Sequence, residues 1–158
     1  MPDDDNSARA IAAAEALGLD ATVTRHGPVS SLAEAAAARG LQPRQIIKTM
    51  VIRVSDADHR FVLVPGDREI AWAKLRSLLG VNRLTMASQQ AAYDASGYVR
   101  GTITPLGSLR PLPVIADERV TGTVSIGGGA HGVALTVDAA ALLPALGATV
   151  ADVTEPAS

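Results

Sequence analysis

The stretch Thr121–Val137, TGTVSIGGGAHGVALTV, decides the fold class, because its glycines follow the spacing G-x-G-x-x-G. In a dinucleotide-binding domain this spacing follows a strand and opens a helix, whose N-terminus faces the pyrophosphate. Residues 123–126 are typical of a strand, but residues 132–137, GVALTV, are apolar and β-branched and predict a second strand instead of a helix. We therefore interpret the stretch as a turn between two strands, built on Gly127, Gly129 and Gly132.

The rest of the chain places most of its helices early and becomes rich in strands later. Helical composition and caps predict helices within residues 6–17, 30–40 (capping box Ser31 and Glu34), 68–79 (capped by Asp67), 88–95 and 139–146. Apolar runs predict strands within residues 20–26, 49–54, 60–65, 82–87, 98–107 and 112–117, with the second and third forming a hairpin. This order predicts an α+β (mixed α/β) fold around a mostly antiparallel or mixed, partly closed sheet.

The composition indicates one domain of ordinary size, residues 1–158, with residues 1–5 expected to be flexible. The absence of cysteine excludes disulfides, thiol catalysis and cysteine metal sites, and it fits a reducing cytosol, so we expect a cytoplasmic protein. No apolar run is long enough to span a membrane, and the histidines are too widely spaced to form a metal motif. We therefore expect no membrane, metal or cofactor. The net charge of −2 is compatible only with a local basic surface for nucleic acid.

Two glycine-rich segments and one lysine are the candidate site residues. The segments are residues 96–107, SGYVRGTITPLG, and the glycine cluster described above. Each is typical of tight turns in a β-rich domain, and each could instead bring backbone N–H groups close to an oxyanion or a phosphate. Lys48 precedes the apolar run TMVIRV, where a lysine is usually a solvated strand end. It would form a site if it lay beside both glycine segments.

Several segments occur in an order that resembles the YbaK family, the freestanding relatives of the editing domain inserted in bacterial prolyl-tRNA synthetase. They are IIKTMVIRV, RFVLVPGDREI, SGYVRGTITPLG, LPVIADE and SIGGGAHGVALTV, and the resemblance extends from about His26 to Val153. It implies a central mixed, barrel-like sheet flanked by helices. It also implies a trans-editing deacylase, which hydrolyses the ester of a mischarged tRNA to free amino acid and intact tRNA. The expected substrate is Cys-tRNA(Pro)-like or Ala-tRNA(Pro)-like.

The same resemblance implies roles for individual residues. Lys48 matches the family's essential lysine, and Gly101 and Pro105 match its substrate-binding G-x-x-x-P loop. His26 and Pro28 match a frequent His-x-Pro near the first strand. Lys48 and Gly101 are therefore the expected catalytic residues. The expected substrate-binding residues are His26, Thr49, Tyr98, Thr102, Pro105, Gly128, Gly129 and Gly132.

The sequence departs from the family at the glycine turn. Gly127 stands where many relatives have a serine, and Ala130 and His131 stand where several carry basic residues. Ala134 occupies a position that is acidic in some relatives. These departures leave the amino-acid specificity open. They also motivate an alternative function, a non-catalytic module of the same fold that binds tRNA or a synthetase.

The sequence has no cysteine and no serine with an evident histidine partner, so a covalent route is not expected. We expect direct attack by water, with backbone N–H groups near Gly101 stabilising the oxyanion. The expected partners are the acceptor end of charged tRNA and prolyl-tRNA synthetase, and the protein is expected to be a monomer or a homodimer. A local basic rim for the tRNA is expected from Arg39, Arg44, Arg53, Arg100 and Arg110.

Overall fold

The computed structural model describes residues 5–157, and its helices are short. They are α1 (Ser7–Ala16), α2 (Leu32–Ala38), the 3-10 turn η1 (Pro43–Gln45), α3 (Trp72–Leu79), α4 (Gln89–Ser96) and α5 (Ala139–Ala145). Ser31 caps α2 as predicted and Ser88 caps α4, because each side chain accepts a hydrogen bond from a backbone N–H of the first turn. The reciprocal half of the predicted capping box is wrong, since the Glu34 carboxylate accepts from the Ser30 backbone N–H. The prediction of a flexible terminus falls outside the described residues except for Asp5, whose carboxylate accepts hydrogen bonds from Ser7.

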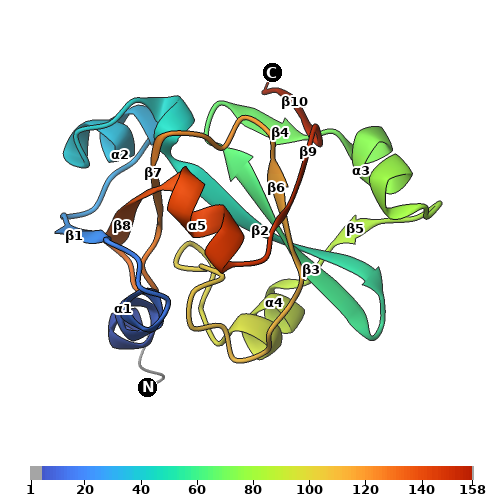
Figure 1. Ribbon diagram of the computed structural model, residues 1–158, viewed down its shortest axis with the longest axis horizontal. Coiled ribbons are helices and arrows are strands. Elements are labelled where there is room, and N and C mark those ends of the chain that lie inside the picture. The colour runs from blue at the N-terminus through green and yellow to red at the C-terminus, as the bar shows by residue number, and fades with distance from the viewer. Residues whose placement is uncertain (1–4, 158) are drawn as a thin grey trace.

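The strands form three sheets (Figure 1). The largest contains, in spatial order, β5 (Thr85–Met86), β2 (Ile47–Ser55), β3 (Asp58–Pro65), β6 (Val114–Asp117) and β9 (Thr149–Ala151). The second contains β1 (Thr22–Arg25), β8 (Val133–Asp138) and β7 (Thr123–Gly127), and the third pairs β10 (Thr154–Pro156) with β4 (Arg68–Ile70). Because β3–β6 and β6–β9 are parallel and the other pairs are antiparallel, the predicted mixed α+β architecture is confirmed.

One backbone bridge links the two larger sheets. Ile46, just before β2, forms an isolated parallel bridge with Ser125 in β7. The two sheets therefore meet at the start of β2, with β1, β7, β8 and α1 on one side of the central β2–β3 pair and α3 on the other (Figure 1). In the order of hydrogen-bonded strands, β1 and β7 are at the edges of one larger sheet and β5 and β9 at the edges of the other, and the expected barrel-like closure stays a prediction.

Both predicted hairpins are present. In β2–β3, Thr49 lies opposite Leu63, and the turn falls within the polar residues 55–58. In β7–β8, Gly127 lies opposite Ala134, so the glycine cluster connects two antiparallel strands. The strand after the last glycine excludes the helix that a dinucleotide-binding turn requires.

Two predicted elements are wrong. Residues 68–70 form β4 and not the first turn of a helix, and α3 begins only at Trp72. Pairing of β4 with β10, at the other end of the chain, overrides the local helical signal. Residues 98–107 form a loop and not a strand, because the buried side chains of Thr102 and Thr104 hydrogen-bond to nearby backbone groups.

The β2–β3 hairpin lies at the centre of the hydrophobic core, since β3 is buried on both faces. Phe61 and Leu63 pack into one apolar cluster, which also contains Tyr98. Val62 and Val64 point to the opposite face and pack into a second cluster below α3. A strand buried on both sides fixes the position of its neighbour β2, which carries Lys48.

Candidate active site

A cavity of about 620 Å³ opens beside β2. Residues 47–51 of β2 form one part of its wall. The other lining residues come mainly from the β5–α4 region, the loop after α4 and the glycine turn. The lining residues outside β2 are Arg39, Met86, Ala87, Gln89, Ala92, Arg100, Gly101, Ile103 and Gly127. The cavity is therefore mostly apolar, with a few polar side chains in its lining, as is usual for small-molecule sites.

Lys48 is half-buried on the wall of this cavity. Its Nζ donates a hydrogen bond to the backbone carbonyl of Arg68 at 2.6 Å, and its other two N–H bonds have no acceptor among the described residues. Burial lowers the pKa of Lys48, an effect that the carboxylates of Glu69 and Asp67 partly oppose. Lys48 is thus not a solvated strand end, and it presents a desolvated ammonium group to the cavity.

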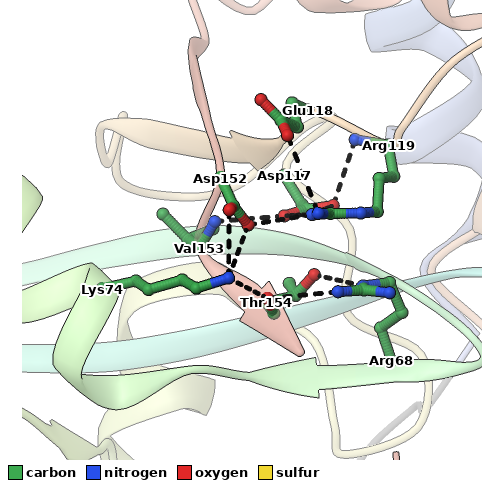
Figure 2. Close-up of polar contacts among 8 residues, drawn as sticks. All are labelled: Arg68, Lys74, Asp117, Glu118, Arg119, Asp152, Val153 and Thr154. Carbon is green, nitrogen blue, oxygen red and sulfur yellow. Dashed lines mark hydrogen bonds and ion pairs between the residues drawn. The ribbon is translucent and has the colours of Figure 1, made fainter. Parts of the chain in front are cut away.

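The carbonyl that binds Lys48 belongs to a strand held by a network of polar contacts (Figure 2). The Arg68 side chain donates from Nε to Thr154 Oγ1 at 2.7 Å, and Lys74 donates to the Thr154 carbonyl at 3.1 Å. Asp117 is wholly buried and accepts a hydrogen bond from the Val153 backbone N–H at 3.1 Å. These contacts fix β10 against β4, and so they fix the acceptor of the Lys48 hydrogen bond.

Gly101 lines the cavity from the loop after α4. Its φ of +89° lies in the region that favours glycine, and a Cβ there would approach His131 Cε1 at 3.2 Å. Thr102 N–H donates to the Val99 carbonyl at 3.0 Å, whereas the N–H groups of Arg100 and Gly101 donate to no residue between 5 and 157. The loop therefore brings unpaired backbone donors to the edge of the cavity.

Helix α1 stabilises this loop through hydrogen bonds from Arg9 to its backbone. Arg9 donates hydrogen bonds to the carbonyls of Ser96, Gly97 and Gly107, and its guanidinium lies 4.3 Å from the centre of the Tyr98 ring. The Tyr98 hydroxyl closes the loop by donating to the Leu106 carbonyl at 2.6 Å. Tyr98, Thr102 and Pro105 are buried and do not line the cavity. We infer that these predicted substrate-binding residues shape the loop.

The glycine turn is packed against the same supports. Gly129 N–H donates to the Thr102 carbonyl at 3.1 Å, and the Gly129 carbonyl accepts from Asn6 N–H at 3.0 Å. A Cβ at Gly129 would lie 2.8 Å from the Asn6 carbonyl oxygen. A Cβ at Gly132 would lie 2.4 Å from the His26 carbonyl oxygen. Gly128 N–H donates to the Val133 carbonyl. Of this turn only Gly127 lines the cavity, so its other glycines serve close backbone packing.

His26 lies outside the cavity but contacts a residue that lines it. Arg39 Nε lies 3.4 Å from His26 Nε2, and Arg39 Nη1 donates to the hydroxyl of buried Ser125 at 3.2 Å. Arg39 and Arg100 are the members of the predicted basic rim that line the cavity. The other three are exposed, and Arg53 forms an ion pair with Asp56.

The structure thus brings together Lys48, Thr49 and Gly101 of the predicted site residues. The Thr49 hydroxyl is shielded from solvent and has no hydrogen-bond partner among the described residues. Sequence reasoning missed the wall formed by Met50, Met86, Gln89, Ala92 and Ile103. Of these, only Gln89 and Ala92 could have been grouped from the sequence, because residues three positions apart lie on the same face of a helix.

A second, smaller cavity of about 350 Å³ adjoins the first and shares Lys48, Met50 and Met86 with it. Glu69, Glu155 and Trp72 are among its other lining residues. Within residues 5–157 no three His, Asp or Glu side chains gather as they would around a metal ion. None of the helices in the same range has the length and apolar character needed to cross a bilayer.

The sequence is similar to parts of larger bacterial enzymes. It is 39% identical over 80 residues to a proline–tRNA ligase of Desulfotalea psychrophila, covering 51% of this chain and 14% of the ligase. It is 33% identical over 109 residues to the proline–tRNA ligase of Bacillus licheniformis, covering 67% and 18% respectively. The chain therefore spans less than a fifth of the length of these relatives.

Solved structures and family profiles give the same result. A crystal structure of a candidate trans-editing enzyme for prolyl-tRNA synthetase superposes with a TM-score of 0.85 and 29% identity, covering 96% of this chain and 98% of that one. The profile of the aminoacyl-tRNA editing domain matches residues 26–144, which include Lys48, Gly101 and the glycine turn. The resemblance found in the sequence is confirmed, and this chain belongs to the aminoacyl-tRNA editing domain family.

Proposed function

We propose that this protein is a trans-editing deacylase that hydrolyses the ester of mischarged aminoacyl-tRNA. The observation that carries the proposal is the cavity on which Lys48, Thr49 and the Gly101 loop converge, in a chain of the editing-domain family. Its lining residues supply a half-buried ammonium group and unpaired backbone N–H groups. An ester carbonyl and the ribose that carries it require donors of these kinds.

The reaction is a direct attack by water. The water oxygen bonds to the ester carbonyl carbon, the bond to the ribose oxygen breaks, and the ribose oxygen takes up a proton, which leaves free amino acid and intact tRNA. The protein offers no evident covalent route, because no serine hydroxyl in the described part of the chain hydrogen-bonds to a histidine and the sequence has no cysteine. The neighbouring ribose hydroxyl of the tRNA is the proposed base.

The negative charge that develops on the carbonyl oxygen is stabilised by the backbone N–H groups at Arg100 and Gly101. One well-placed donor of this kind contributes about 3–4 kcal/mol to transition-state stabilisation in other enzymes. Lys48 orients the substrate through the two N–H bonds that Arg68 leaves unoccupied. Its fixed position on β2 keeps these donors in place before the substrate arrives.

The substrate carries a small amino acid, as in Ala-tRNA(Pro) or Cys-tRNA(Pro). A cavity of about 620 Å³ has to accept both the terminal adenosine and the aminoacyl group, and its wall is apolar at Ile47, Val51 and Ile103. An apolar pocket separates side chains that differ by one methylene by only about 1–3 kcal/mol, so exclusion by size has to supply most of the selectivity. A prolyl-tRNA synthetase is the proposed partner that delivers the tRNA.

The experiment is a deacylation assay with tRNA(Pro) charged with alanine, cysteine, serine or proline. We expect at least one of the small mischarged substrates to be cleared faster than Pro-tRNA(Pro), and we expect the Lys48→Ala variant to lose this activity. Folding of both proteins is checked by circular dichroism. If the folded parent clears none of the panel above the spontaneous rate but binds the charged tRNA, the non-catalytic module is the better assignment.

A further inference from the structure

Arg39 brings a positive charge without an ion-pair partner among the described residues to the wall of the cavity. It is the C-cap residue of α2, and its half-buried side chain lines the large cavity. No carboxylate of residues 5–157 lies within ion-pair distance of its guanidinium, whereas Arg53, Arg60 and Arg119 all pair with aspartates. Burial lowers the pKa of Arg39, but a guanidinium remains charged at any physiological pH.

Neutral groups hold this guanidinium in place. Nη1 donates to Ser125 Oγ, which is wholly buried in β7, and Nε points to His26 Nε2. His26 Nδ1 lies 2.8 Å from the Gly27 carbonyl oxygen. In the tautomer that donates from Nδ1 to this carbonyl, Nε2 accepts from Arg39. This arrangement fixes two of the three guanidinium nitrogens and leaves Nη2 without a partner among the described residues.

We propose that Arg39 binds a phosphate group of the RNA end that enters the cavity. The inference rests on the proposed function in taking the tRNA acceptor end as the occupant. A positioned guanidinium with free N–H bonds is the preferred protein group for phosphate oxygens. His26 and Ser125 then act as positioning residues, which explains why His26 matches a family motif although it does not line the cavity.

Adenosine and adenosine 5′-monophosphate test this assignment, because they differ only in the phosphate. Their dissociation constants are measured by NMR titration with the parent, Arg39→Gln and a control, Arg44→Gln. Arg44 is an exposed arginine of η1 that does not line the cavity. We expect the parent to prefer the monophosphate, and we expect Arg39→Gln to reduce this preference at least fivefold while adenosine binding changes by less than twofold. Arg44→Gln should keep the parental ratio.

A second measurement uses an uncharged acceptor-stem RNA hairpin ending in CCA. Loss of one phosphate contact in a single-stranded region lowers the slope of log K against log salt by about 0.7, so Arg39→Gln should show this reduction. Neither measurement requires turnover. A protein that never deacylates but shows an Arg39-dependent phosphate preference would refute the proposed function and support this inference.

Three results would overturn the assignment: no preference of the parent for the monophosphate, an unchanged preference in Arg39→Gln, or an equal loss in Arg44→Gln. A carboxylate could also bind a guanidinium, so alanine and alaninamide are titrated in parallel. If Arg39→Gln abolishes a preference for alanine and leaves the phosphate preference intact, the residue binds the carboxylate of the released amino acid instead.

Discussion

Lys48 Nζ lies 2.6 Å from the carbonyl oxygen of Arg68, in a strand that the C-terminal residues hold in place. The hydrogen bond crosses from the five-stranded sheet to the two-stranded sheet, and Lys48 lines both the larger and the smaller cavity. One of the three donors of the ammonium group is thereby used to orient the other two. The geometry of the cavity depends on this contact, and the predictions below begin with it.

Replacing Lys48 by alanine should lower deacylation at least tenfold and leave the fold intact. The reason is that the substrate loses the only lysine that lines the cavity, while the hydrophobic neighbours on β2 and β3 remain. The measurement is single-turnover deacylation together with thermal unfolding of the same preparation. A folded variant with the parental rate would show that Lys48 has no part in the reaction.

Lys48→Met should be at least as stable as the parent at neutral pH. Burial lowers the pKa of Lys48 from the ordinary value of 10.5, so folding disfavours its charged form. This destabilisation is fully present below the lowered pKa and disappears as the pH rises from there toward 10.5. The melting temperatures of the two proteins are compared between pH 7 and 10.5. Parent stability that falls relative to Lys48→Met as the pH rises would contradict this sign.

Gly101→Val should lower the deacylation rate about a hundredfold, which is roughly the contribution of one oxyanion donor. The rate of Gly101→Ala should lie between those of Gly101→Val and the parent. A side chain there meets His131 at the cavity edge and strains a φ of +89°. Gly122→Ala is the matched control, since Gly122 has a φ of +67° with open space around it and does not line the cavity. Equal losses of activity in Gly101→Ala and Gly122→Ala would assign the effect to backbone strain alone.

Thr154→Val should reduce the free energy of unfolding by about 1–3 kcal/mol, because it removes the acceptor of the Arg68 Nε hydrogen bond in a buried position. If the contact also positions Lys48, kcat should fall several-fold and rescue by Thr154→Ser should be substantial. Thr149→Val, in an exposed position on the edge strand β9, is the control. Unchanged kcat in a destabilised Thr154→Val would limit the network to a structural role.

Gly129→Ala should destabilise the protein more than Gly147→Ala. Both glycines have positive φ, which costs an alanine about 1–2 kcal/mol. Only at Gly129 would the added Cβ also meet backbone, 2.8 Å from the Asn6 carbonyl oxygen, whereas nothing lies within 4 Å at Gly147. Chemical denaturation measures the difference between the two variants. Equal losses would mean that the turn can relax around a side chain.

The two hairpins could be predicted because their information is local. Alternating β-branched residues on both sides of a polar or glycine-rich turn leave few other conformations for residues 47–65 and 123–138. The start of α3 could not be predicted in the same way. Asp67 followed by periodic apolar residues is a good helix signal, but Arg68 bonds to Thr154, 86 positions away, and that contact makes residues 68–70 a strand.

Residues that line the cavity could be predicted where they interrupt a local pattern, and could not where they fit one. Lys48 and Gly101 stand out as a lysine before an apolar strand and a glycine in a punctuated loop, and both line the cavity. Met86 and Ala92 look like ordinary helix and strand residues, and only the packing of α4 and β5 against β2 gives them a place on the wall. Tyr98 and Thr102 lie within the same motif as Gly101, yet their side chains turn inward to hold the loop.

Helix α1 has a consequence for how the protein matures. Arg9 bonds to Gly107, which is 98 positions further along the chain, and Asn6 bonds to Gly129. The contacts of α1 therefore form only after residues 107 and 129 have been synthesised, which makes them contacts of long sequence separation. A chain that ends before Gly107 lacks them, so we expect the loops of the candidate site to become ordered late in folding.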